Sequence, residues 1–181
     1  MTVGQGVQLA IVWIIDSVLR DITKMIITAI LIGISILFII AWLSELGATP
    51  VVNSSFLKPC PNKPNCVCSE YIDDTEHYIE PLSLSTKQLS KAINYIKISV
   101  QSLEGKIVTD ENTYLAATFS SSFFGFIDDV EFRVDNENQL IHIRSAARLG
   151  YSDFGINNKR VNNLKTIIRQ QLDQVDKNSS N

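Results

Sequence analysis

The longest apolar run in the chain is residues 25–43, MIITAILIGISILFIIAWL, which include no charged residue. A helix of this length rises ~28 Å, close to the ~30 Å hydrocarbon core of a bilayer. A helix buried in a soluble core needs a polar face, and this run offers only Thr28 and Ser35. The pattern therefore predicts a transmembrane helix at residues 25–43 and, from the Gly, Pro, Asn and Ser that follow, a linker over residues 44–58.

Basic residues beside the run predict its orientation. Arg20 and Lys24 precede it, whereas the first charge after it is Glu45. Because basic residues stay on the cytoplasmic side, we expect a single-pass signal anchor with a cytoplasmic N-terminus and the rest of the chain outside the cytoplasm. In a bacterium this means the inner membrane and the periplasm. A cleaved signal peptide is the alternative, but its apolar region is shorter, ~7–15 residues.

Residues 1–24 are also rich in apolar side chains, but Asp16, Arg20 and Asp21 interrupt them. We expect a cytoplasmic amphipathic leader that extends the membrane helix, lies in the interface or binds a partner helix. A second membrane span is the alternative, and it would place the following domain in the cytoplasm.

Patterns over residues 59–175 predict one globular domain, with 176–181 as a polar tail. Apolar residues at helical spacing predict one helix between Ser85 and Gly105 and another over residues 161–175. Between these helices lie four strand-like runs, at residues 107–108, 114–119, 126–134 and 140–146. The polar turn DNENQ joins the last two runs as a hairpin. The order predicts an α+β fold, in which one N-terminal transmembrane helix is followed by a small antiparallel sheet with helices packed on one face.

The hairpin predicts a division between two faces of the sheet. Because side chains alternate along a strand, burying the apolar residues of both strands on one side fixes the parity of their register. The apolar set includes Val130, Phe132, Val134, Ile141 and Ile143. The opposite face then collects Asp129, Glu131, Arg133, His142 and Arg144, while Asp128 falls on the apolar side. After the hairpin, RLGYSDFGINNKR supplies Arg148, Tyr151, Asp153, Asn157 and Arg160 around two glycines.

Three kinds of chemistry fit this polar set. The first is cross-strand ion pairing on an exposed sheet face. The second is a site for a small anionic ligand, because arginine forks suit phosphate and carboxylate; its arginines would be Arg133, Arg144, Arg148 and Arg160. The third is acid–base catalysis by Asp129 and Glu131 with His142. The sequence contains no nucleophile elbow, phosphate loop, zinc-protease helix or dinucleotide fingerprint.

Charge and cysteine content narrow the picture further. The net charge of −3 and the pI of about 5.4 give no basic excess that would suit nucleic acid. All three cysteines, Cys60, Cys66 and Cys68, lie in LKPCPNKPNCVCSE. They could form a disulfide, a reactive or redox centre, or a zinc site with His77 as fourth ligand. An oxidising compartment outside the cytoplasm favours the disulfide. We therefore expect no metal and no cofactor.

Three motifs in order, CPNKPNC, FIDDVEFRV and IHIRSAARLGYSDFGINNKR, resemble the uncharacterised family catalogued as domain of unknown function 1499. The resemblance leaves the membrane segment outside, and no agreed activity attaches to the family. In that family a serine is usual where this chain has Cys68, and a serine is frequent where it has Ala147. The first difference implies a Cys60–Cys66 disulfide with Cys68 as the extra thiol. The second argues against a serine-centred mechanism at position 147, although Ser145 remains.

The leading hypothesis is a membrane-anchored extracytoplasmic domain that binds a small anionic ligand or an envelope protein through the Asp/Arg-rich face and the GYSDFG loop. A hydrolase that uses Asp129, Glu131 and His142 is one alternative, and a structural or assembly protein of the membrane is the other. The candidate ligand-binding residues are Asp128, Asp129, Glu131, Arg133, His142, Arg144, Ser145, Arg148, Tyr151, Asp153, Asn157 and Arg160.

Overall fold

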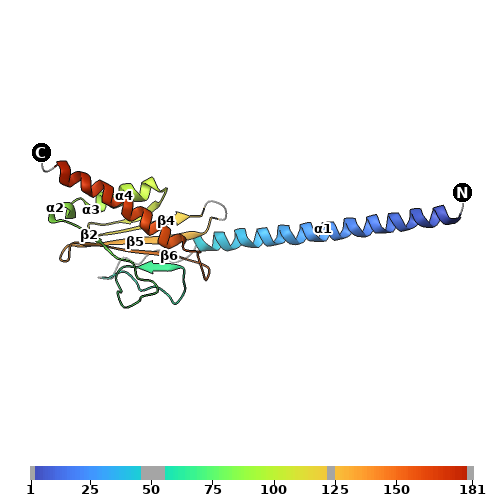
Figure 1. Cartoon of the computed structure of the whole chain (residues 1–181), viewed down its shortest axis with the longest axis horizontal. Helices are drawn as coiled ribbons and strands as arrows, with labels where there is room; N and C mark the ends of the chain where they lie inside the picture. The colour runs from blue at the N-terminus through green and yellow to red at the C-terminus, as the bar shows by residue number, and fades with distance from the viewer. Residues whose placement is uncertain (1–2, 46–55, 122–124, 179–181) are drawn as a thin grey trace. The chain divides into compact units, whose positions relative to one another are not determined.

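The computed structural model describes residues 3–45, 56–121 and 125–178, which form two compact units divided after Ala41 (Figure 1). The first unit is helical: α1, Val3–Glu45, runs without interruption through the expected leader and the expected membrane span. Within it, Ile11–Leu43 is long and apolar enough to cross a membrane by length and composition, and its most apolar window of 18 residues has a mean hydropathy of 2.8. The boundary between leader and span at residues 24 and 25 stays a prediction.

The charges near the N-terminal end of α1 pair with one another along the helix. Arg20 donates to Asp16 four residues earlier, and Lys24 lies 3.4 Å from Asp21. Pairs at these spacings neutralise each other on one helix surface. The four charges therefore sum to zero, which lowers the cost of holding them beside apolar residues.

The second unit contains a six-stranded sheet in which every pair is antiparallel, and the α+β prediction is confirmed. The path order is β1-β6-β5-β4-β3, with β2 also paired to β6. The strands are β1 (Cys66–Cys68), β2 (Leu82–Ser83), β3 (Lys106–Asp110), β4 (Tyr114–Ser120), β5 (Ile127–Asp135) and β6 (Leu140–Ala147). Neither β1 nor β2 was expected, because two or three residues are too few for a strand period to show.

Three helices pack on one face of the sheet: α2 (Thr86–Leu89), α3 (Ala92–Ser102) and α4 (Ile156–Asn178). The single helix expected after Ser85 is divided into α2 and α3. The expected start is present, since the Gln88 side-chain oxygen accepts the Ser85 N–H at 2.8 Å. The Gln88 amide also donates to the Leu172 carbonyl of α4 at 3.4 Å. These two bonds hold α2 as a separate turn against α4.

The hydrophobic core lies between the sheet and its helices. The parity predicted for the hairpin is confirmed, since Phe132 pairs with Ile143 and Val134 with Ile141. These side chains are buried against the apolar stripe of α4. Its buried members are Val161, Leu164, Ile168 and Leu172.

The opposite face of the sheet is also covered, which differs from the exposed face expected in the ion-pairing interpretation. Figure 1 shows the irregular segment that contains β1 on the side away from the helices. Leu57 is buried there, and its carbonyl accepts the Tyr71 hydroxyl at 2.6 Å. The domain therefore starts no later than Leu57. Because this segment covers the second face, the charged residues beneath it are largely withdrawn from water.

Candidate functional site

Two adjacent aspartates on β5 point to opposite faces of the sheet. Asp128 lies on the helix side, where its carboxylate accepts Arg160 of α4 at 2.7 Å. Asp129 lies on the other side, where it accepts Arg148 through two bonds of 2.9 and 2.8 Å. Arg148 and Arg160 are the two ends of RLGYSDFGINNKR. The aspartates thus fasten both ends of this segment to one strand, and we call them the aspartate clasp.

On the helix side, Arg160 links the clasp to a buried polar cluster. It donates to the Asn157 side-chain oxygen at 2.7 Å, and its guanidinium lies 5.0 Å from the centre of the Phe119 ring. The Ser145 hydroxyl, fully buried, also donates to Asn157. Burial raises the pKa of Asp128 even though Arg160 opposes the shift. Arg160 already compensates the charge of the Asp128 carboxylate, which is therefore not free to take up another cation.

The loop between the clasp arginines is fixed to its surroundings by amides and a cap. Asp153 lies three residues before the start of α4, and its carboxylate accepts the Asn157 N–H at 2.7 Å and the Gly155 N–H at 3.0 Å. The buried Asn65 donates to the Gly150 carbonyl at 3.0 Å, and its own carbonyl accepts the Asn157 amide at 3.1 Å. Asn65 therefore connects the loop to the segment that precedes β1.

On the other face, carboxylates pair with arginines across neighbouring strands. Glu131 accepts Arg144 at 2.9 Å and the Tyr114 hydroxyl at 2.8 Å. Glu70, from the covering segment, accepts two bonds from Arg133, of 2.6 and 3.1 Å. Burial raises the pKa of the Tyr114 hydroxyl, and the charge of Glu131 raises it further.

All four candidate arginines are thus engaged by carboxylates, at nitrogen–oxygen distances of 2.6 to 2.9 Å. An anionic ligand would have to displace one of these carboxylates. The arrangement suits a rigid structural network, which we call the frame, better than an open anion-binding site.

His142 contacts the covering segment through its Nδ1. Its Nδ1 lies 3.3 Å from the Ser69 hydroxyl and 3.6 Å from a Glu70 oxygen. A serine–histidine–acid triad needs the serine and the acid on opposite ring nitrogens, whereas here both face the same nitrogen. The Ser69 hydroxyl also accepts the Ile143 N–H at 2.7 Å and is buried. Ser69, His142 and Glu70 therefore do not form such a triad.

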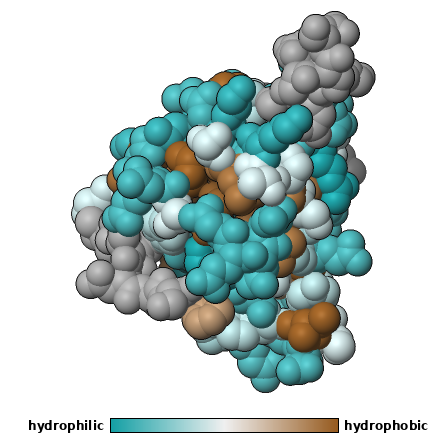
Figure 2. Space-filling model, turned by 90° about the vertical axis from the view of Figure 1, so that its left-hand side faces the viewer, coloured by the Kyte–Doolittle hydropathy of each residue, from teal (hydrophilic) through white to brown (hydrophobic). Residues whose placement is uncertain are grey.

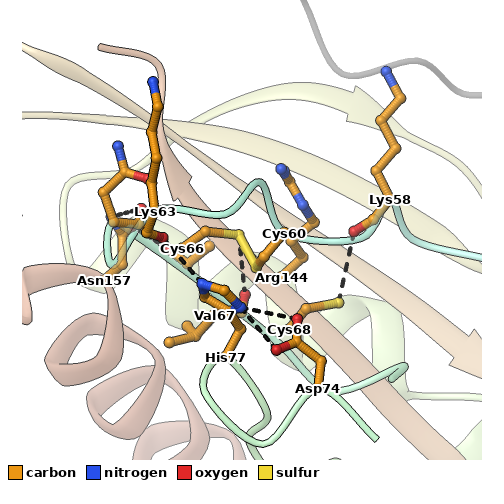
Figure 3. The surroundings of a disulfide bond; sticks show 12 residues. Lys58, Cys60, Lys63, Cys66, Val67, Cys68, Asp74, His77, Arg144 and Asn157 are labelled. Carbon is orange, nitrogen blue, oxygen red and sulfur yellow. Dashed lines mark hydrogen bonds and ion pairs between the residues drawn. A yellow bond between two sulfur atoms is a disulfide. The ribbon is translucent and has the colours of Figure 1, made fainter. Parts of the chain in front are cut away.

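Cys60 and Cys66 form a disulfide with a Cα–Cα distance of 5.6 Å, as expected (Figure 3). Cys68 is the free, buried thiol, and burial raises its pKa to about 11. His77 stands beside it, with Nδ1 2.8 Å from an Asp74 oxygen and Nε2 3.0 Å from the Lys63 carbonyl. Both ring nitrogens therefore face oxygen acceptors. Within the described residues no group of His, Cys, Asp and Glu is arranged to hold a metal ion.

Burial alone would lower the pKa of His77, but its bonds to Asp74 and Lys63 outweigh burial and raise it. A proton on each nitrogen satisfies both acceptors. His77 thus joins the turn before β1 to the turn that follows it.

In contrast to the frame, the loop between the clasp arginines carries exposed apolar side chains. The described domain has eight exposed large hydrophobic residues, and half of them lie within residues 149–156. They are Leu149, Tyr151, Phe154 and Ile156. Phe154 is 95% exposed and has a φ of 55°, in the left-handed region that non-glycine residues avoid. We call these four residues the apolar tip.

The predicted site residues therefore divide among three places. Asp128, Ser145, Asp153, Asn157 and Arg160 meet on the helix side. Asp129, Glu131, Arg133, His142, Arg144 and Arg148 lie on the covered face, and Tyr151 lies on the apolar tip. Sequence reasoning missed Asn65, Ser69, Glu70 and Tyr114, which complete the two clusters. The first three lie on the covering segment, whose irregular backbone gives no periodic signal.

The domain that contains the aspartate clasp also matches a known family. The model of the family described as "Protein of unknown function (DUF1499)" matches residues 56–168. The chain belongs to the DUF1499 family. No curated protein and no solved structure matches it. The match begins at Phe56, beside the buried Leu57, and leaves α1 outside the DUF1499 domain.

Proposed function

We propose that this DUF1499 protein is a membrane-tethered binding module whose recognition surface is the apolar tip. The Asp/Arg clusters hold that surface in place, and they do not themselves contact the ligand. The single observation that carries the proposal is Phe154, which is almost fully exposed and held in a left-handed backbone conformation. An exposed phenylalanine there gains nothing from packing and costs backbone strain.

Charge and surroundings support the same assignment. Asp153 is the one charged residue between Leu149 and Ile156, and its carboxylate is engaged by backbone N–H groups at the start of α4. The arginines that end the segment are engaged by Asp128 and Asp129. The exposed surface of the apolar tip is therefore essentially uncharged, which suits a hydrophobic or amphipathic partner.

This shifts the earlier hypothesis from the Asp/Arg face to the loop. A partner in the envelope, whether protein or membrane, remains part of the proposal, whereas a small anionic ligand at the four arginines does not, because each already has a carboxylate. We also propose that α1 anchors the module with its N-terminus in the cytoplasm, because Arg20 and Lys24 lie on the N-terminal side of the most apolar stretch.

A photo-crosslinking amino acid placed at position 154 tests the proposal in native membranes. The full-length chain is used, and the same substitution at Ile72, a 68% exposed residue outside the tip, serves as the matched control. We expect a defined adduct from position 154 and none from position 72. Equal labelling at the two positions would remove the apolar tip from the proposal.

A further inference from the structure

We infer that the occupant of the apolar tip is the lipid bilayer interface itself, so that the domain has a second membrane contact besides α1. This inference rests on the proposed function and names its partner. The structure contributes four independent arguments: the shape of the loop, its side-chain chemistry, the state of the nearby charges and the length of the tether.

The loop projects away from the domain. A Cβ added at Gly155 would meet no atom within 4 Å, and one added at Gly150 would meet only the Ser152 carbonyl at 3.9 Å. Both glycines have positive φ, as does Phe154, and these angles make the turn sharp. A projecting apolar loop can enter a bilayer interface. The other class of occupant is a protein with a pocket complementary to the loop.

The side chains of the tip match those that enter the interface. Leu149, Phe154 and Ile156 are aliphatic or aromatic without polar atoms, and Tyr151 combines an apolar ring with a hydroxyl. Such side chains bury ~5–10 Å into the boundary between headgroups and acyl chains, where tyrosine is enriched. Because no uncompensated charge lies among them, insertion leaves no buried ion without a partner.

Charges near the tip suit contact with headgroups without requiring anionic lipid. Ile156 and Lys159 line an open hollow of about 520 Å³ together with Glu104 and Arg160. Lys159 is exposed and long enough to reach outward from an inserted tip. The hollow holds one acidic residue, Glu104, beside Lys159, and Asp128 pairs with Arg160, so apolar burial rather than net charge would drive insertion.

The covalent tether makes this contact intramolecular. Residues 46–55 separate α1 from the domain, and a fully extended chain over that stretch reaches at most roughly 40 Å. This short covalent connection keeps the domain near a membrane that α1 would cross, which raises the effective concentration of lipid around the apolar tip.

The test places a fluorescent label at position 154 of the full chain in lipid vesicles. A Phe154→Cys variant in a Cys68→Ser background is labelled with an environment-sensitive dye and reconstituted into phosphatidylcholine vesicles with or without brominated acyl chains. Glu137→Cys, an exposed residue in the hairpin at the other end of β5, is the control. Figure 2 shows that end of the domain, where hydrophilic residues cover most of the surface.

We expect brominated lipid to quench the label at position 154 and not the label at position 137. Replacing Leu149 and Ile156 together by serine should reduce the ratio of inserted to free tip ~100- to 10,000-fold, because each buried side chain of this size contributes about one to two powers of ten. Adding anionic lipid or 0.5 M salt should change quenching less than twofold. A weaker far-UV circular dichroism signal would reveal unfolding of the double variant. Quenching is therefore compared only between variants with unchanged spectra.

Two outcomes would overturn the inference and are distinguishable. If position 154 crosslinks to a protein and brominated lipid does not quench it, the bilayer is the wrong occupant and the proposed binding function stands. If position 154 neither crosslinks nor responds to lipid, the inference and the proposed function both fail.

Discussion

The buried Glu131–Arg144 pair offers the sharpest test of the Asp/Arg network as a frame. Glu131 of β5 pairs directly with Arg144 of β6. Their side chains are 5% and 13% exposed, and they approach within 2.9 Å. At an effective dielectric constant near 20 their attraction is ~6 kcal/mol. Desolvation of each ion costs several kcal/mol and offsets most of that attraction. Removing one partner therefore leaves the other with its desolvation cost and little compensation.

Glu131→Leu and Arg144→Met should each lower the free energy of unfolding by about 3–5 kcal/mol, the usual cost of an unpaired buried charge. Such a loss is a large share of the ~5–15 kcal/mol typical of a domain. The double variant should lose no more than ~2 kcal/mol, because two apolar side chains of similar volume replace the pair. Its remaining cost is the Tyr114 hydroxyl, which loses its acceptor.

Urea unfolding of the full chain in detergent, followed by near-ultraviolet circular dichroism, measures all three variants. The tyrosines of the domain report its packing. The reasoning is refuted if either single variant costs less than ~1 kcal/mol, or if the cost of the double variant equals the sum of the single ones. Additive costs would mean that water, not the partner, stabilises each charge.

Four further outcomes concern Phe154, His77, the disulfide and Cys68. Phe154→Asn should stabilise the domain by roughly 0.5–1 kcal/mol, since asparagine tolerates a positive φ; a lower urea midpoint would contradict this. The raised pKa of His77 means that its contribution to stability is complete below the unfolded pKa, ~6.5, and is lost as pH rises through the folded pKa. The difference in stability between wild type and His77→Gln should accordingly shrink from pH 5.5 to pH 8.5, and a constant or growing difference would contradict the pairing with oxygen acceptors. Reduction of the Cys60–Cys66 bond, whose cysteines are six positions apart, should cost ~2 kcal/mol. Cys68 should resist alkylation at pH 8 until the chain unfolds, as mass spectrometry of labelled peptides would show.

The elements in which apolar residues repeat at regular spacing could be predicted from the sequence. The β5–β6 hairpin is the clearest case, since burial of Phe132 with Ile143 required the opposite face to carry Glu131 and Arg144. That alternation also placed Asp128 apart from the other charges, on the side where Arg160 meets it.

The covering segment could not be predicted in the same way. Glu70 reaches Arg133 across 63 residues of sequence, and Asn65 reaches Asn157 across 92. The first contact joins two side chains and the second joins a side chain to the backbone, and neither produces a repeating pattern in the sequence. Without that segment the charged face resembled an ordinary solvated surface, and the protrusion of Phe154 depends on a backbone angle that composition does not reveal.

The aspartate clasp has a consequence for the thermodynamics of binding. A free loop of this length loses conformational entropy when a partner orders it, at roughly 1–2 kcal/mol per residue fixed. Here Asp128 and Asp129 hold both ends of the segment, and Asn65 and Asp153 fix its middle. Folding of the domain has already met that entropic cost, so the side chains of the tip can contribute to affinity almost in full.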